Sequence, residues 1–416
     1  MISRGKSLKG SVKAVLEFIE KFIAVKDEKS MSLSSMEVIT YYAILEKTVD
    51  FDLSISDYEK SDIVRQAIYD SIKDGGLNEK SFFKNFNRRH LEVLNSVILS
   101  FRVITQLSID SQLLPNGLNF TLNGVRIKLM RSLPKAYQKS RKIEEDNIGN
   151  YHGKASTPHD VYCVSYVSAR SPQEAYHKAF HQIEIVRAAL NFSYSLKRKH
   201  LIKSYGPENY VFSGPTHTVH SKDGEAFSDL THYEPEYTRS NRKITNLPNA
   251  NLFTKNCLHI VNRVKTLKIG KWVGHGLTMY VEALDIANPK LSFTMLWSVL
   301  EYFTVTDSNY SDTVKKASSI WNDHELVKSL LLVLRESRND FVHKGVTSKT
   351  SADYLEILRG ILDELILFTI NIPKELDDLA ALEEYLNLPR SNAELNAKLL
   401  ETKKQASLIQ LKLKTS

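Results

Sequence analysis

Residues 118–129 read LNFTLNGVRIKL, and this stretch decides whether the chain is wholly helical. Apolar and polar side chains alternate on both sides of Asn123-Gly124, a dipeptide that favours the two-residue turn of a β-hairpin. Such a turn places four apolar side chains on one face, in the pairs Leu122 with Val125 and Phe120 with Ile127. The stretch therefore predicts a hairpin, and with it a sheet inside a chain that is otherwise rich in helix formers.

A strand and a capped helix are expected after the hairpin. The segment DVYCVSYVSAR (160–170) reads as a strand, and SPQEAYHKAFHQIEIVRAALNF (171–192) follows it directly. Ser171 suits the N-cap, Pro172 the first helical position, and Glu174 the third position of a capping box. Together with short alternating runs between residues 205 and 250, these features predict a small α+β middle domain over residues 113–250.

Three histidines of this middle domain, His217, His220 and His232, could be taken for metal ligands. Side chains of a strand alternate between its two faces, so residues three apart point in opposite directions. We therefore expect His217 and His220 on opposite faces and no metal site. We interpret the histidines as exposed polar positions of strands.

Helical patterns lie on both sides of the middle domain. Apolar spacing predicts an N-terminal helical domain over 1–112, with helix continuing through RRHLEVLNSVILSFRVITQL (88–107). It also predicts a C-terminal helical bundle over 251–373 and a helical or partly disordered tail over 374–416. One stripe of the bundle is expected to consist of Phe293, Leu296, Trp297, Leu300 and Phe303. The fold class is thus mainly α, and α+β overall.

Composition limits the setting in which this chain works. Its 416 residues, 42% hydrophobic and 25% charged, are enough for two or three domains. Cys163 and Cys257 lie far apart, which indicates neither a disulfide framework nor a zinc ribbon and favours a reducing compartment. The first 25 residues resemble a signal peptide in outline, but Glu17 and Glu20 interrupt the apolar part. We expect a cytoplasmic protein without a membrane span.

Positive charge is concentrated in two blocks. Residues 111–142 contain seven Lys and Arg and no Asp or Glu, and residues 237–281 contain eight and none. Such blocks are either solvated surface balanced by acids from elsewhere or a footprint for a polyanion such as RNA. On the second interpretation, Arg263, Lys265 and Lys268 are candidates for RNA binding.

The stretch RESRNDFVHKG (335–345) places Arg338 and His343 near the end of a predicted helix, with four residues between them. Asp323 can cap that helix and Gly345 can end it. The helix dipole favours the protonated imidazole of His343, which suits a general acid near neutral pH. Five residues correspond to about 500° of rotation, so the two side chains point about 140° apart. A working pair therefore needs a bend near the helix end or a second copy of the motif.

Two segments together resemble a known family. RNDFVHKG (338–345), preceded by LWSVLEYF (296–303), is similar to the Arg, four-residue, His signature of HEPN ribonucleases, most closely their Apea-like branch. Asn339 matches the polar residue that follows the arginine in that family, and Glu301 matches a frequent acid in the preceding helix. The similarity covers roughly residues 285–373, and residues 161–192 more weakly resemble the strand and helix that often precede such a domain.

The resemblance implies a helical bundle that forms a homodimer about the motif helices, and RNA cleavage that needs no metal and no cofactor. In that chemistry the ribose 2′-hydroxyl attacks the adjacent phosphate. His343 would move the proton, Arg338 would hold the phosphate, Asn339 would orient one of these groups and Glu301 would position Arg338 or His343. Two further cations, Arg335 and Lys344, would add positive potential at the rim. Relatives of this kind usually act in anti-phage defence or as toxins.

Two other interpretations remain open from the sequence. The first is a non-catalytic HEPN module that joins two copies while the preceding domains bind nucleic acid or protein. The second is a conventional metal-dependent enzyme, but the chain has no Gly-rich phosphate loop, no H-E-x-x-H and no clustered carboxylate pair. If the chain is a nuclease, it must be held inactive, and we expect the N-terminal helical domain to sense a trigger or restrain the bundle.

Overall fold

The structure of this chain is a computed structural model. It describes residues 11–21, 23–27, 30–33, 37–52, 55, 57–110, 113–115, 117–152, 161–195, 209–234, 249–306, 310–344 and 351–415.

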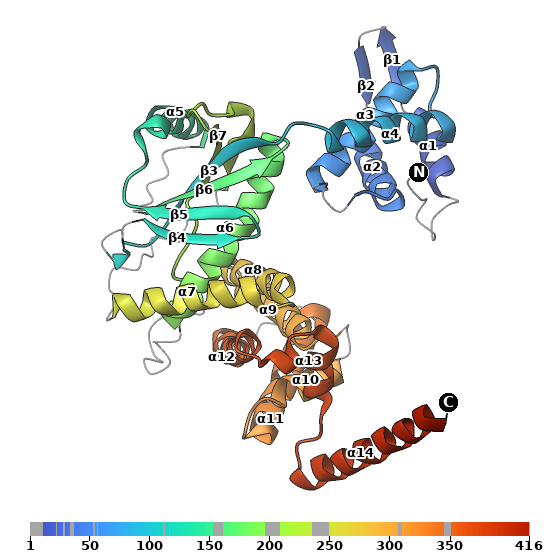
Figure 1. Ribbon diagram of the computed structural model, residues 1–416. Helices are drawn as coiled ribbons and strands as arrows, with labels where there is room; N and C mark the ends of the chain where they lie inside the picture. Colours follow the sequence, from blue (N-terminus) through green and yellow to red (C-terminus); the bar gives the residue numbers. More distant parts are fainter. Residues whose placement is uncertain are drawn as a thin grey trace.

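The first part of the chain is a small helical unit (Figure 1). Its helices are α1 (Ser11–Lys21), α2 (Glu37–Thr48), α3 (Asp57–Lys73) and α4 (Glu79–Leu94), and a two-stranded hairpin, β1 (Ile23–Asp27) and β2 (Ser30–Leu33), follows α1. Ile19 of α1 and Phe82 and Phe86 of α4 are buried in one hydrophobic core. Asn78 caps α4, since its side chain accepts a hydrogen bond from the Ser81 amide.

Helix does not continue through residue 107, so that part of the sequence prediction is wrong. The helix α4 ends at Leu94, and Leu99–Leu107 is a strand, β3. Phe101, Val103 and Leu107 occupy alternate positions and are all buried, which is the two-residue period of a strand.

Within the described residues, six strands form one antiparallel sheet in the order β4-β5-β6-β3-β7-β8. Their bounds are β4 (Leu118–Leu122), β5 (Val125–Met130), β6 (Val161–Ala169), β7 (Thr216–Ser221) and β8 (His232–Tyr233), with β3 between β6 and β7. The predicted hairpin is confirmed in its register, because Phe120 pairs with Ile127 and Leu122 with Val125. All four of these side chains are buried on the same side of the sheet.

Helix α6 (Pro172–Ser195) packs on that buried side (Figure 1). Its predicted cap is confirmed, because the Glu174 amide donates to Ser171 Oγ at 3.1 Å. The Glu174 carboxylate reaches one residue further back than a capping box requires and accepts from the Arg170 amide. Helix α5 (Lys135–His152) packs on the other side of the sheet at β7.

The later part of the chain is a bundle of helices whose core is continuous with that of the sheet and α6. Its members are α7 (Ala250–Thr266), α8 (Gly270–Asp285), α9 (Pro289–Phe303), α10 (Tyr310–Ser318), α11 (His324–Lys344) and α12 (Ser351–Ile370). The predicted stripe of α9 is confirmed, since Phe293, Leu296, Trp297, Leu300 and Phe303 are all buried. The fold is mainly helical with a six-stranded antiparallel sheet in its middle part, as the sequence predicted.

The tail is helical as well. Helix α13 (Leu379–Asn387) packs into the bundle through Leu382 and Leu386. Helix α14 (Asn392–Thr415) extends away from it, and its described side chains are almost all exposed (Figure 1).

Candidate functional site

Helix packing brings Arg338 and Glu301 into one electrostatic environment. Arg338 continues the buried stripe of α11, because it lies four residues after Leu334 and seven after Leu331, both of which are buried. That stripe packs against α9, where Glu301 lies one turn after the buried Trp297. The Trp297 indole nitrogen donates to Glu301 Oε1 at 3.1 Å.

Opposing effects act on the pKa of the Glu301 carboxyl group. Burial raises its pKa, and the hydrogen bond from Trp297 and the positive charge of Arg338 partly offset that rise. The net pKa lies above the ordinary glutamate value. A carboxyl in this state can orient a neighbouring guanidinium and can itself hold a proton more readily than an exposed glutamate.

The structure describes the side chains of only some of the other motif residues on α11. Arg338 Nη1 lies 3.5 Å from Asn339 Oδ1, the limit of a hydrogen bond, and Arg335 is partly exposed one turn earlier. His343 and Lys344 belong to α11, but their side chains lie outside the described residues, as does Gly345. The structure thus places Arg338 beside Asn339 and within electrostatic reach of Glu301, and the pairing with His343 stays a prediction.

The chain reversal after α9 fixes the helix end that carries Glu301. The Thr306 amide donates to the Glu301 carbonyl and the Val305 amide to the Tyr302 carbonyl, both at 3.0 Å, the pattern of a Schellman motif. Val305 has a φ of +52°, which is strained for a β-branched residue. Lys316 of α10 holds the turn, because its Nζ donates to the Val305 carbonyl at 3.1 Å.

A second face of α11 is apolar and exposed. Leu326, Leu330 and Val333 recur at helical spacing and are 62%, 36% and 48% exposed. Within the described residues this apolar stripe of α11 lies on the motif helix without an apolar partner covering it, and it points away from the stripe that ends in Arg338.

The basic residues predicted to bind RNA behave differently from one another. Arg263 is engaged with the end of α12, because its Nε donates to the Ile370 carbonyl and its Nη2 to the Ile372 carbonyl, each at 2.8 Å. Lys265 and Lys268 are exposed. Arg263 therefore stabilises the bundle, and only the two lysines remain accessible to a polyanion.

Two cations of the sheet belong to the basic block 111–142, although sequence reasoning did not name them among the candidates for RNA binding. Arg126 and Lys128 alternate with the buried Val125, Ile127 and Leu129, so they point to the side of the sheet opposite α6. The alternation inside the hairpin already contained this signal.

The prediction for the histidines is half correct. His217 and His220 do lie on opposite faces: His217 packs against Phe180 of α6, with ring centroids 4.7 Å apart, and His220 against Tyr137 of α5, at 5.6 Å. However, both are fully buried rather than exposed, because each face of β7 is covered by a helix. Burial lowers the pKa of both imidazoles. Among the described residues no group of three His, Cys, Asp or Glu is arranged to hold a metal ion.

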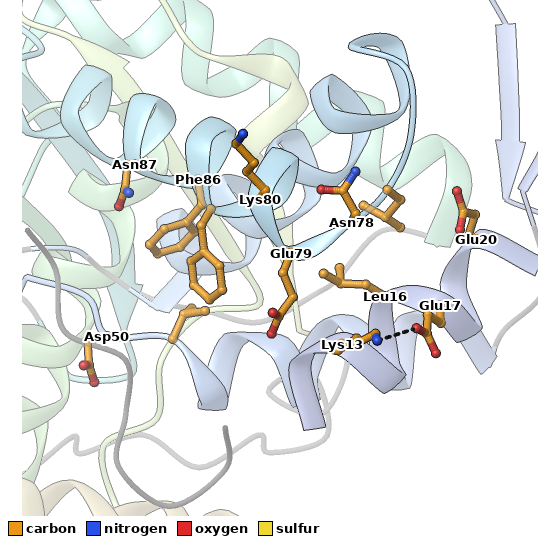
Figure 2. Close-up of a pocket in the computed structure, with 13 residues that line it drawn as sticks. Lys13, Leu16, Glu17, Glu20, Asp50, Asn78, Glu79, Lys80, Phe86 and Asn87 are labelled. Atoms are coloured by element: carbon orange, nitrogen blue, oxygen red, sulfur yellow. Dashed lines mark ion pairs between the residues drawn. The ribbon is translucent and has the colours of Figure 1, made fainter. Parts of the chain in front are cut away.

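A hollow of about 830 Å³ lies in the N-terminal helical unit between α1 and α4 (Figure 2). Leu16, Phe83 and Phe86 are among its apolar lining residues. Its charged lining consists of Glu17, Glu20, Asp50, Glu79, Lys13 and Lys80. Carboxylates outnumber lysines there, so this hollow does not suit the phosphates of RNA.

No described helix is long and apolar enough to span a bilayer. Both cysteines are free and buried, and burial raises the pKa of each thiol, so neither is a reactive thiolate.

Comparisons with protein-family models, with curated proteins and with solved structures find no match to this chain.

Proposed function

We propose that this chain is a metal-independent endoribonuclease of the HEPN type, which acts on RNA in the cytoplasm through a site shared by two copies. The observation that carries the proposal is that α11 packs on α9 and that Arg338 lies close enough to Glu301 for its charge to lower the pKa of that carboxyl. The resemblance assigns roles in catalysis to the same two residues. If Arg338 were only a polar residue at the end of a helix, there would be no reason to expect an acid of another helix near it.

In the proposed reaction, the 2′-hydroxyl of a ribose attacks the adjacent phosphorus, and the bond to the 5′-oxygen of the next nucleotide breaks. Arg338 holds the non-bridging phosphate oxygens as negative charge develops on them. His343 moves the proton from the attacking hydroxyl or to the leaving oxygen. We assign Glu301 the part of a positioning residue, since its carboxyl lies within the electrostatic reach of the Arg338 guanidinium.

The second copy is part of the proposal because Arg338 and His343 point about 140° apart on one straight helix. The apolar stripe of α11, made of Leu326, Leu330 and Val333, offers a surface through which two motif helices can pack. A dimer about this stripe would bring the two motif helices side by side.

The test compares the intact protein with Arg338→Ala and His343→Ala. Each protein is expressed and its effect on growth and on RNA integrity is measured, and purified proteins are assayed on RNA with and without EDTA. We expect both variants to lose cleavage while they keep the wild-type unfolding transition and oligomeric state, and we expect EDTA to have no effect. Equal RNA cleavage by all three proteins contradicts the proposal.

A non-catalytic dimeric module is the second candidate. The observation in its favour is that Arg338 continues a buried stripe, a placement that also stabilises helix packing. On this alternative the wild-type protein cuts no RNA, the apolar stripe of α11 still forms a dimer, and Arg338→Ala changes only stability. A role in anti-phage defence or toxicity rests on the resemblance alone and needs its own test. That test compares the survival of phage-infected cells that express the wild type with that of cells that express Arg338→Ala.

A further inference from the structure

One face of the sheet carries a row of aromatic and cationic side chains. Tyr166 of β6 pairs directly with Arg102 of β3 on one side and with Arg126 of β5 on the other. Directly paired residues point to the same face of a sheet. The three side chains therefore form a continuous row across three strands, on the side opposite α6.

The cations of this row lie close to the aromatic ring. The guanidinium carbon of Arg102 is 4.5 Å from the centroid of Tyr166, and that of Arg126 is 5.8 Å away. Lys128 Nζ lies 5.5 Å from the same centroid. All three distances are within the range of cation–π interactions, so a single ring is surrounded by three positive charges.

This positive charge is not balanced locally. The strands β3, β4, β5 and β6 contain no Asp or Glu at all. In the part of the chain that the structure describes, no carboxylate forms an ion pair with Arg102, Arg126 or Lys128. In α4, by contrast, Arg88 and Arg89 share the carboxylate of Asp70, at 2.8 and 2.7 Å.

The row is open to solvent. Arg126 is exposed, and Arg102, Lys128 and Tyr166 are partly exposed. Helix α5 covers this side near β7, where Tyr137 packs on Ile104 and Val164. Two exposed hydroxyl groups, Ser100 and its partner Ser168, lie next to the row on the same face.

We propose that this cationic sheet face, made of Arg102, Arg126, Lys128 and Tyr166, binds single-stranded RNA. Phosphates lie against the cations, and an unstacked base lies against the ring of Tyr166, an arrangement that a duplex cannot adopt because its bases are already stacked. The hydroxyl groups of Ser100 and Ser168 provide donors and acceptors for the ribose. The inference rests on the proposed function, since it names where the RNA substrate of that nuclease is held.

The experiment measures binding apart from cleavage. The full chain carrying Arg338→Ala is titrated into a fluorescein-labelled single strand of about 12 nucleotides, and fluorescence anisotropy is followed at several KCl concentrations. Adding Arg126→Glu and Lys128→Glu should weaken binding at least tenfold. It should also reduce the slope of log affinity against log salt by about 1.4, because two phosphate contacts are lost.

The tyrosine is tested separately. Tyr166→Ala should weaken binding about tenfold and leave the salt slope unchanged, because it removes a stacking surface and no charge. Tyr166→Phe keeps the ring and should bind as the parent does. A duplex of the same sequence should bind more weakly than the single strand, and tighter or equal binding of the duplex overturns the inference.

Two further double variants serve as matched charge reversals. Lys403→Glu with Lys404→Glu makes the same change of charge on α14, where both lysines are exposed, and should leave the affinity within about twofold at moderate salt. Lys265→Glu with Lys268→Glu tests the competing basic segment. If that pair weakens binding while Arg126→Glu with Lys128→Glu does not, the sheet face is not the binding site.

Failure of this inference is distinguishable from failure of the nuclease proposal. If the sheet variants bind RNA as the parent does, while Arg338→Ala still abolishes cleavage, only the inference about the sheet is wrong. If the sheet variants lose binding but Arg338→Ala cuts RNA as well as the wild type, the binding site stands and the proposed catalytic site does not.

Discussion

The positive charge of Arg338 on α11 reaches the carboxyl group of Glu301 on α9, where it lowers a pKa that burial raises. The two residues are 37 positions apart in the sequence, and the charge of one acts on the other only because the apolar stripes of both helices are packed into one core. This relationship ties the candidate chemistry to the fold, since any change in the packing of α9 on α11 alters the charge that Glu301 experiences.

The first prediction concerns stability and pH. Because the folded-state pKa of Glu301 is raised, the folded chain binds more protons than the unfolded chain above about pH 4.3. The contribution of Glu301 to stability is therefore greatest at low pH and falls as pH rises. Relative to the wild type, Glu301→Gln should gain in free energy of unfolding as pH rises above about 4.3, as measured by urea titration. Glu336→Gln removes an exposed charge from α11 as a control, and an equal pH trend in both variants contradicts the prediction.

The second prediction concerns the apolar stripe of α11. Leu330→Glu with Val333→Glu should convert a dimer into a monomer, because two carboxylates would be buried in the interface without partners. The unfolding transition of the monomer should change little, since both residues are exposed in the single chain. Sedimentation velocity over a range of concentrations measures the outcome. Leu399→Glu with Leu400→Glu on α14 is the matched control, and a dimer that survives the α11 pair shows that the interface lies elsewhere.

Local pattern was enough to predict the hairpin, the cap of α6 and the apolar stripe of α9, because neighbours in sequence determine each of them. It failed at β3. The segment 88–107 contains enough apolar residues to satisfy a helical period, and the break at Asn95 is weak. Only pairing with β6 and β7 on both sides distinguishes a central strand from a helix, and that pairing depends on segments more than 50 residues away.

The candidate site was also predictable only in part, because some of its properties depend on contacts between distant segments of the chain. The motif identifies Arg338 and Asn339, but the sequence cannot say that Arg263 is hydrogen-bonded to carbonyl groups at the end of α12. Nor does it show that His217 and His220 are buried, because the covering helices come from distant parts of the chain. Charge alone therefore overestimates which cations are accessible, and tertiary contacts decide it.

The third prediction follows from Arg263. Arg263→Glu should lower the free energy of unfolding by about 2–4 kcal/mol, because two hydrogen bonds to main-chain carbonyls are lost and a carboxylate is placed beside them. Lys265→Glu, on the exposed side of the same helix, should change it by less than about 0.5 kcal/mol. Urea unfolding of both variants measures this difference. Similar stability of the two variants contradicts a structural role for Arg263.

The fourth prediction concerns His220. Burial lowers its pKa to about 4, so below about pH 6.5 the unfolded chain takes up a proton that the folded chain does not. The wild type should therefore lose stability relative to His220→Gln as pH falls from about 6.5 to about 4. Urea unfolding at intervals across this range tests it. A constant difference between the two proteins means that His220 titrates alike in both states.

The fifth prediction concerns the turn after α9. A β-branched residue in the left-handed region is strained by about 1–2 kcal/mol, and Val305 lies there with a φ of +52°. Glycine removes that strain but makes the unfolded chain more flexible, which costs about 0.5–1 kcal/mol. Val305→Gly should thus raise the free energy of unfolding by about 0.5–1 kcal/mol. Val314→Gly, at a buried helical position of α10, should lower it. If Val305→Gly instead destabilises the chain, the side-chain contacts of Val305 outweigh its backbone strain, and the turn that fixes Glu301 depends on those contacts.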